Sequence, residues 1–107
     1  MRERKDFKTS VFVRTNSPQS GKITNDLEKI IQKGLDGIVI PKVDSAKELK
    51  KIEKIISNLE KKRKLKKIRL IPSIESALGV INCYEIALSS KRIDAIVFGI
   101  FLSLIHI

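Results

Sequence analysis

The sequence has one cysteine, Cys83, no tryptophan, five glycines and few aromatic residues, which make up 5% of its 107 residues. A single cysteine excludes a disulfide framework and a zinc site built on several cysteines, and it fits a reducing cytosol. The longest apolar run covers about 13 residues, 95–107, whereas a membrane-spanning helix needs roughly 20. No apolar segment of a signal peptide follows the charged first residues. We therefore expect a cytoplasmic protein without a membrane partner.

Acidic residues are few as well: there are 12 Asp and Glu and 22 Lys and Arg, which gives a formal net charge of +10. The densest basic cluster, Lys47 to Lys67, holds ten basic residues but one arginine and no aromatic residue. Nucleic-acid sites favour arginine for bidentate contacts and aromatic rings for base stacking. The composition therefore favours a solvated helix face and argues against a nucleic-acid partner. A basic α/β module that binds nucleic acid or another polyanion stays open as the alternative function.

Four short apolar runs of the strand type alternate with three amphipathic segments of the helix type. The runs cover residues 11–15, 37–41, 68–74 and 94–98. Their spacing of about 26–31 residues is that of a βα unit. The sequence thus predicts the order β-α-β-α-β-α-β, and the continuous apolar runs indicate a parallel sheet covered on both faces.

Local signals place the three helices. Asn25 with Glu28, and Ser45 with Glu48, have the spacing of capping boxes and predict the starts of the first two helices. Gly34 is expected to end the first helix. The third helix is expected to carry one apolar face, formed by Ala77, Val80, Ile81, Tyr84, Ala87 and Leu88.

Two α/β architectures share this pattern. One is part of a (β/α)8 TIM barrel, which needs about 250 residues, so that about four parallel βα units are half of it. The other is a small doubly wound parallel sheet. Neither a Gly-x-Gly-x-x-Gly nor a Walker motif follows the first strand, which removes the usual sign of a nucleotide-binding sheet. We expect a polar lead-in over 1–10, a partial barrel domain over 11–100, and an apolar tail over 101–107.

Candidate functional residues follow the strands, because ligand sites of both architectures lie at the carboxyl ends of the strands. Arg14, Lys42, Glu75 and Gly99 occupy these positions. An arginine fork can hold a substrate carboxylate, and a carboxylate after an apolar run suits a metal ion or cation. Purely structural explanations of these residues stay open. Arg14 could pair with Asp36 or Asp44, Glu75 could favour a helix start, and charged strand ends could simply be solvated.

Four motifs in order resemble the HpcH/HpaI aldolase and citrate lyase beta subunit family, which includes malyl-CoA and citramalyl-CoA lyases. They lie over most of residues 10–100, at Val13–Asn16, Gly37–Val43, Ile74–Val80 and Asp94–Gly99. The resemblance implies a (β/α)8 barrel that assembles as a trimer or hexamer. It also implies a carbon–carbon lyase acting on acyl-CoA thioesters or on short 2-keto and hydroxy acids.

The resemblance assigns roles to individual residues. Arg14 resembles the catalytic arginine that grips the carboxylate and keto oxygen of the substrate, and Glu75 resembles one of two carboxylate ligands of Mg²⁺. Gly79 resembles a small residue that allows close approach near the substrate, although simple helix packing also explains a glycine there. Lys42 is the further substrate-binding candidate, from its place after the second strand.

The sequence departs from the family after the fourth strand. The family continues with Phe-Gly-x-Glu-Asp-Leu or similar, and this Asp is the second metal ligand. Here Phe98 and Gly99 lead into Ile100, and no charged residue occurs after Asp94. Either the reading frame is broken or truncated, or the tail is foreign to the fold; His106 is a weak substitute ligand. The resemblance thus implies a fragment of a Mg²⁺-dependent lyase that is inactive as this isolated chain.

Overall fold

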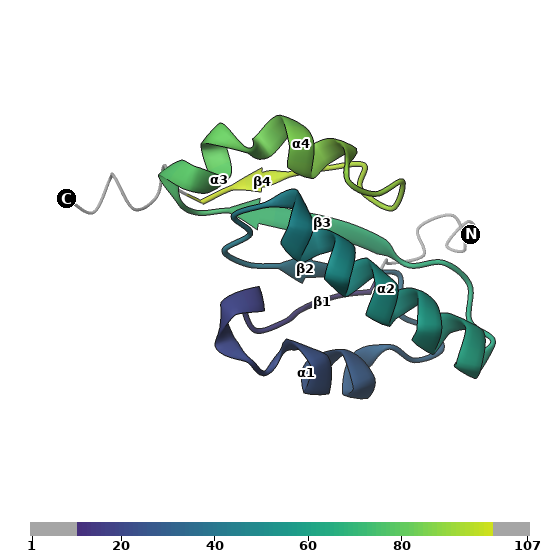
Figure 1. Ribbon diagram of the computed structural model, residues 1–107. Coiled ribbons are helices and arrows are strands. Elements are labelled where there is room, and N and C mark those ends of the chain that lie inside the picture. Colours follow the sequence, from purple (N-terminus) through teal and green to yellow (C-terminus); the bar gives the residue numbers. More distant parts are fainter. Residues whose placement is uncertain (1–10, 100–107) are drawn as a thin grey trace, which may run out of the picture.

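A parallel four-stranded sheet organises the computed structural model, which describes residues 11–99 (Figure 1). Its strands are β1 (Phe12–Arg14), β2 (Gly37–Ile40), β3 (Arg69–Ile74) and β4 (Val97–Phe98). The helices are the 3-10 turn η2 (Pro18–Ser20) and the α-helices α1 (Ile23–Ile30), α2 (Ala46–Arg63), α3 (Ala77–Ile81) and α4 (Cys83–Leu88). Within residues 11–99, no helix is long and apolar enough to cross a membrane.

The strand order separates the two predicted architectures. Each strand pairs in parallel with the next along the chain, in the order β1-β2-β3-β4. Helix α2 packs against α1 on one side and α4 on the other, so the helices follow the strands in sequence order (Figure 1). A doubly wound sheet reverses its strand order and places helices on both faces. The sequential order is that of a (β/α)8 barrel, so the predicted partial barrel is confirmed and the doubly wound alternative is wrong.

One hydrophobic core lies between the sheet and the helices. Ile38, Ile40 and Leu70 are fully buried in it, because alternate side chains of a strand point to the same face. Val39 and Ile71, at intervening positions, are only partly buried. The expectation of a sheet covered on both faces is therefore wrong for the described part of the chain. In a closed barrel the second face is the interior, which side chains from all strands fill, and this accounts for apolar residues on both faces.

Helix α2 begins where the capping box predicts. The Ser45 Oγ accepts a hydrogen bond from the Glu48 N–H at 3.3 Å, and Glu48 Oε1 accepts one from the Asp44 N–H at 2.9 Å. All ten basic residues between Lys47 and Lys67 are exposed, as expected for a solvated helix face. The outer side of α2 is therefore a water-facing surface, and its inner side supplies core residues.

The predicted start of the first helix is wrong. Helix α1 begins at Ile23, two residues before Asn25, and no side chain caps it. Its first turn is instead held by the preceding loop, since Asn16 donates from N and Nδ2 to the Asp26 Oδ2, at 2.9 and 2.6 Å. The N–H and amide of Asn16, with weaker help from nearby lysines, lower the pKa of Asp26. The helix ends at Ile30, before Gly34, whose φ of 97° belongs to the following turn.

The third predicted helix is broken into two short helices. It forms α3 and α4, which meet at Asn82, whose Nδ2 donates to the Asp44 carbonyl at 2.8 Å. The break directs Ile86 into the core, where it is fully buried. Four large side chains of the predicted apolar face are exposed rather than packed into the core: Val80, Ile81, Tyr84 and Leu88.

A buried ion pair joins α2 to the loop between α4 and β4. Arg92 donates from Nη2 and Nη1 to the two carboxylate oxygens of Glu60, each at 2.7 Å, and from Nη1 to the Ile68 carbonyl at 3.1 Å. Glu60 Oε2 also accepts the Ile68 N–H at 2.8 Å. The Arg92 and Glu60 side chains are only 5% and 7% exposed. The hydrogen bonds that Arg92 donates to the Glu60 carboxylate raise the pKa of Arg92.

Candidate functional site

The carboxyl edge of the sheet brings two predicted site residues together. Arg14 ends β1 and Glu75 directly follows β3, and the Arg14 Nη2 lies 3.3 Å from the Glu75 Oε2. The Arg14 side chain is 62% exposed and that of Glu75 is 22% exposed. Glu75 is thus the partner of Arg14, and the alternative pairing with Asp36 or Asp44 is wrong for the described residues. The pair faces the side of the sheet that the helices leave open.

Ser73 and Gly99 complete the surroundings of Glu75. The Ser73 Oγ donates to the Glu75 Oε2 at 2.9 Å, and Ser73 is 3% exposed. A Cβ atom on Gly99 would lie 3.0 Å from the Glu75 Cγ and 3.8 Å from the Ser73 Oγ. Sequence analysis missed Ser73. Its place two residues before Glu75 was the available signal, because the two side chains then share one face of the strand.

Lys42 and Gly79 lie near this edge without a described contact to the Arg14–Glu75 pair. Lys42 is exposed and has a φ of 54°, which bends the chain after β2. Gly79 is buried, and a Cβ atom there would lie 2.7 Å from the Val43 carbonyl oxygen. The close approach predicted for Gly79 therefore joins α3 to a backbone segment. Substrate contacts of Lys42 and Gly79 stay predictions.

The donor set fits one ligand of a hard divalent cation. A carboxylate is the usual protein ligand of Mg²⁺, which binds through one or two carboxylates together with water and substrate oxygens. Glu75 supplies one carboxylate, and residues 11–99 contain no group of three or more metal-binding side chains. The acid expected after Ile100 and the substitute ligand His106 both fall outside the described residues. Glu75 can therefore hold a metal ion only together with ligands from elsewhere.

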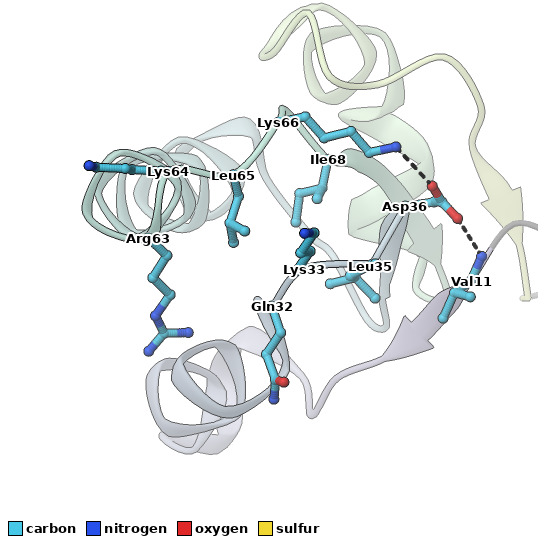
Figure 2. Close-up of a pocket in the computed structure, with 11 residues that line it drawn as sticks. Val11, Gln32, Lys33, Leu35, Asp36, Arg63, Lys64, Leu65, Lys66 and Ile68 are labelled. Carbon is cyan, nitrogen blue, oxygen red and sulfur yellow. Dashed lines mark hydrogen bonds and ion pairs between the residues drawn. The ribbon is translucent and has the colours of Figure 1, made fainter.

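A hollow of about 700 Å³ lies at the opposite, amino end of the strands, between the carboxyl ends of α1 and α2 (Figure 2). Arg63 from its wall donates from Nη1 to the carbonyl oxygens of Glu28 and Ile31, at 2.9 and 2.6 Å. Lys66 reaches Asp36 at 3.3 Å, and the Val11 N–H donates to the same carboxylate (Figure 2). These cations satisfy carbonyl groups and a carboxylate of the chain itself, as is common at helix ends. We assign this hollow a structural role.

Comparisons with known proteins point to one family. Residues 1–101 match the HpcH/HpaI aldolase/citrate lyase family. The citrate lyase subunit beta of Escherichia coli K12 is 38% identical over 90 residues, which cover 82% of this chain and 30% of that protein. The mitochondrial citramalyl-CoA lyase of Homo sapiens is 32% identical over 102 residues, which cover 85% of this chain and 30% of that protein. The chain thus spans about a third of the length of these curated relatives.

A solved structure agrees with the fold. The crystal structure of RipC from Yersinia pestis superposes with a TM-score of 0.69 and 23% sequence identity. The match covers 84% of this chain and 40% of that chain. At this identity the likeness supports the fold, and the partial coverage agrees with four βα units of a larger barrel.

Proposed function

Because the chain belongs to the HpcH/HpaI aldolase/citrate lyase family, we propose that it forms part of a Mg²⁺-dependent carbon–carbon lyase. Its substrate class is a short hydroxy acid or the CoA thioester of one, cleaved to a 2-keto acid and an acyl fragment. The observation that supports the proposal is the Arg14–Glu75 pair at the carboxyl edge of a partial barrel. This is the edge at which barrel enzymes build their active sites.

Arg14 is the proposed substrate-binding and catalytic residue. Its Nη2 faces Glu75, whereas its Nε and Nη1 donate no hydrogen bond to any of residues 11–99. These donors can hold a carboxylate of the substrate by paired, charge-assisted hydrogen bonds. In the cleavage direction the hydroxyl gives its proton to a base supplied by the rest of the barrel, its C–O bond becomes a carbonyl, and the carbon–carbon bond breaks. Its electron pair passes to the carbon beside the acyl group, as an enolate that then takes up a proton. Arg14 stabilises the negatively charged oxygen that forms when the hydroxyl loses its proton.

Glu75 is the proposed metal ligand, and Mg²⁺ bound there would act as a Lewis acid toward the keto oxygen. Glu75 would also balance the charge of Arg14, which keeps the guanidinium at the edge of the sheet. Lys42 and Gly79 are proposed to contribute to the substrate-facing surface. The chain contains one of the two expected carboxylate ligands, so we expect the isolated chain to be inactive.

The remaining properties of the whole enzyme are proposed from the family. We expect it to assemble as a homotrimer or homohexamer and to act in the cytoplasm. Acyl-CoA thioesters or 2-keto and hydroxy acids are its proposed partners. The polyanion alternative has no support beyond the exposed lysines of α2.

A graft tests the proposal on a complete barrel. Residues 11–99 of this chain would replace the matching segment of the human citramalyl-CoA lyase, and Mg²⁺-dependent cleavage of citramalyl-CoA would be measured. We expect the graft to be active and Glu75→Gln to lower kcat/KM by at least about 100-fold, as for the loss of one stabilising group. The isolated chain should show no turnover.

Two controls separate chemistry from folding. Lys54→Gln, on the exposed side of α2, should leave kcat/KM unchanged. Circular dichroism and the oligomeric state of each graft should match those of the parent enzyme. A graft that folds and assembles but cleaves no thioester, or one in which Glu75→Gln retains full activity, would contradict the proposal.

A further inference from the structure

We propose that Ser73 and Gly99 are positioning residues that hold the Glu75 carboxylate in one orientation, with Oε1 directed to a divalent cation. The inference rests on the proposed function for the identity of the ligand. The orientation itself rests on contacts of Glu75 with Arg14, Ser73 and Gly99. Neither residue is expected to touch the substrate.

Two donors from different strands fix one oxygen of the carboxylate. The buried Ser73 Oγ donates to the Glu75 Oε2 at 2.9 Å, and the Arg14 Nη2 reaches the same atom at 3.3 Å. Within residues 11–99 no donor contacts Oε1. A carboxylate with one oxygen saturated by the protein and the other left open presents a single, directed ligand atom. This is the arrangement by which an outer hydrogen bond orients a metal ligand.

Gly99 provides the space that this orientation needs. Its N–H donates to the Ile74 carbonyl at 2.8 Å, which fixes the end of β4 against the residue before Glu75. A Cβ atom on Gly99 would lie 3.0 Å from the Glu75 Cγ, which is tighter than ordinary van der Waals contact, and 3.6 Å from its Cδ, which is an ordinary contact distance. An alanine there would press on the Glu75 side chain, so we infer that the glycine keeps the carboxylate in place by its lack of a side chain.

The first experiment tests orientation without a metal. Three-bond NMR couplings would report the rotamers of Glu75 in the chain itself. We expect one dominant rotamer in the native sequence and averaging among several in Ser73→Ala. Ser73→Thr keeps the hydroxyl and should largely restore the single rotamer. Gly99→Ala should shift the Glu75 rotamer populations even though Ser73 is intact.

Ser90→Ala is the matched control, because the Ser90 Oγ also donates to a glutamate, Glu53, at 2.7 Å and lies on another part of the fold. It removes one serine–glutamate hydrogen bond and should leave the Glu75 rotamers unchanged. Unchanged Glu75 rotamers in a folded Ser73→Ala chain would overturn the positioning role, whatever the function of the protein.

The second experiment tests the ligand in the active graft. Mn²⁺ affinity, measured by electron paramagnetic resonance, should fall about 10- to 100-fold in Ser73→Ala, the usual effect of losing an outer partner of a metal ligand. It should be lost in Glu75→Gln and be unchanged in Ser90→Ala. Native affinity in Glu75→Gln would overturn the proposed metal site. If Mn²⁺ affinity is lost in Glu75→Gln but stays native in Ser73→Ala, the positioning role alone would be overturned.

Discussion

Two arginine–glutamate pairs of this molecule have the same chemistry and opposite surroundings. Arg92 and Glu60 are 5% and 7% exposed and meet through two hydrogen bonds of 2.7 Å. Arg14 and Glu75 are 62% and 22% exposed and meet through one contact of 3.3 Å. Every oxygen of Glu60 is bonded within the protein, whereas Glu75 has one oxygen without a donor from residues 11–99. The buried pair can only hold the fold together, and the exposed pair can exchange partners with a ligand.

The largest expected effect follows from breaking the buried pair. Arg92→Ala leaves Glu60 charged and unpaired in the interior, and losing one partner of such a pair costs about 3–5 kcal/mol. We expect the free energy of unfolding to fall by this amount in urea titrations monitored by circular dichroism. The double variant Arg92→Met with Glu60→Leu should regain much of the loss, because both charges are then removed. A loss below about 1 kcal/mol in Arg92→Ala, the range of an exposed pair, would contradict the distinction.

A second prediction concerns the packing of α3 against the segment that follows β2. In Gly79→Ala the new Cβ would lie 2.7 Å from the Val43 carbonyl oxygen and 2.9 Å from the Ile74 Cγ2. Overpacking of this kind typically costs about 1–3 kcal/mol, more than the helix propensity gained. We expect a lower unfolding midpoint, while Leu78→Ala on the exposed side of α3 should change it little. A more stable Gly79→Ala chain would show that α3 does not approach Val43 so closely.

A smaller effect is expected from breaking the exposed pair. Arg14→Met should change the free energy of unfolding by less than about 1 kcal/mol, because solvent screens the contact and ordering the long side chain costs entropy. The same urea titration gives this value. A loss as large as that of Arg92→Ala would mean that Arg14 supports the fold rather than a ligand.

The smallest effect is a pH dependence at Asp26, near the same edge. The Asn16 N–H lowers the pKa of Asp26 in the folded chain below its usual 3.8. As the pH falls, the Asp26 carboxylate takes up a proton at a higher pH in the unfolded chain than in the folded chain. The stabilisation from Asp26 is therefore present above the usual pKa of 3.8 and is lost as the pH falls through the lowered pKa of the folded chain. Thermal unfolding should therefore show a difference between the native chain and Asp26→Asn near neutral pH that shrinks in strong acid. A difference that grows toward low pH would contradict the assignment.

The residues that local rules predicted well are those whose neighbours in space follow from the topology. Arg14 ends a parallel strand and Glu75 directly follows another, and parallel strands end at one edge, so the strand assignment alone places both residues at the same edge, although it does not select Glu75 over Asp44 as the partner of Arg14. Ser45 was also predicted, because its cap involves only the next three residues. The Ser45 cap lies within a single helix, and the position of Arg14 and Glu75 follows from the repeated parallel strands.

The misses depend on contacts that no local pattern encodes. Asn25 with Glu28 has the spacing of a cap, but the loop residue Asn16 holds the first turn of α1 instead. The periodicity of residues 77–88 identifies an apolar face but not the break at Asn82 that turns it outward. The buried Arg92 lies 32 positions from Glu60 and looks like any other basic residue in the sequence.

The most direct test of the account is the value of kcat/KM for citramalyl-CoA cleavage in the graft, measured for Arg14→Met and for Arg92→Met with Glu60→Leu at a temperature at which both are folded. The account predicts a loss of at least about 100-fold for Arg14→Met, as when a group that stabilises developing charge is removed. The buried double variant should keep a value close to that of the parent graft. Full activity in Arg14→Met would contradict the claim that the exposed pair is the functional one.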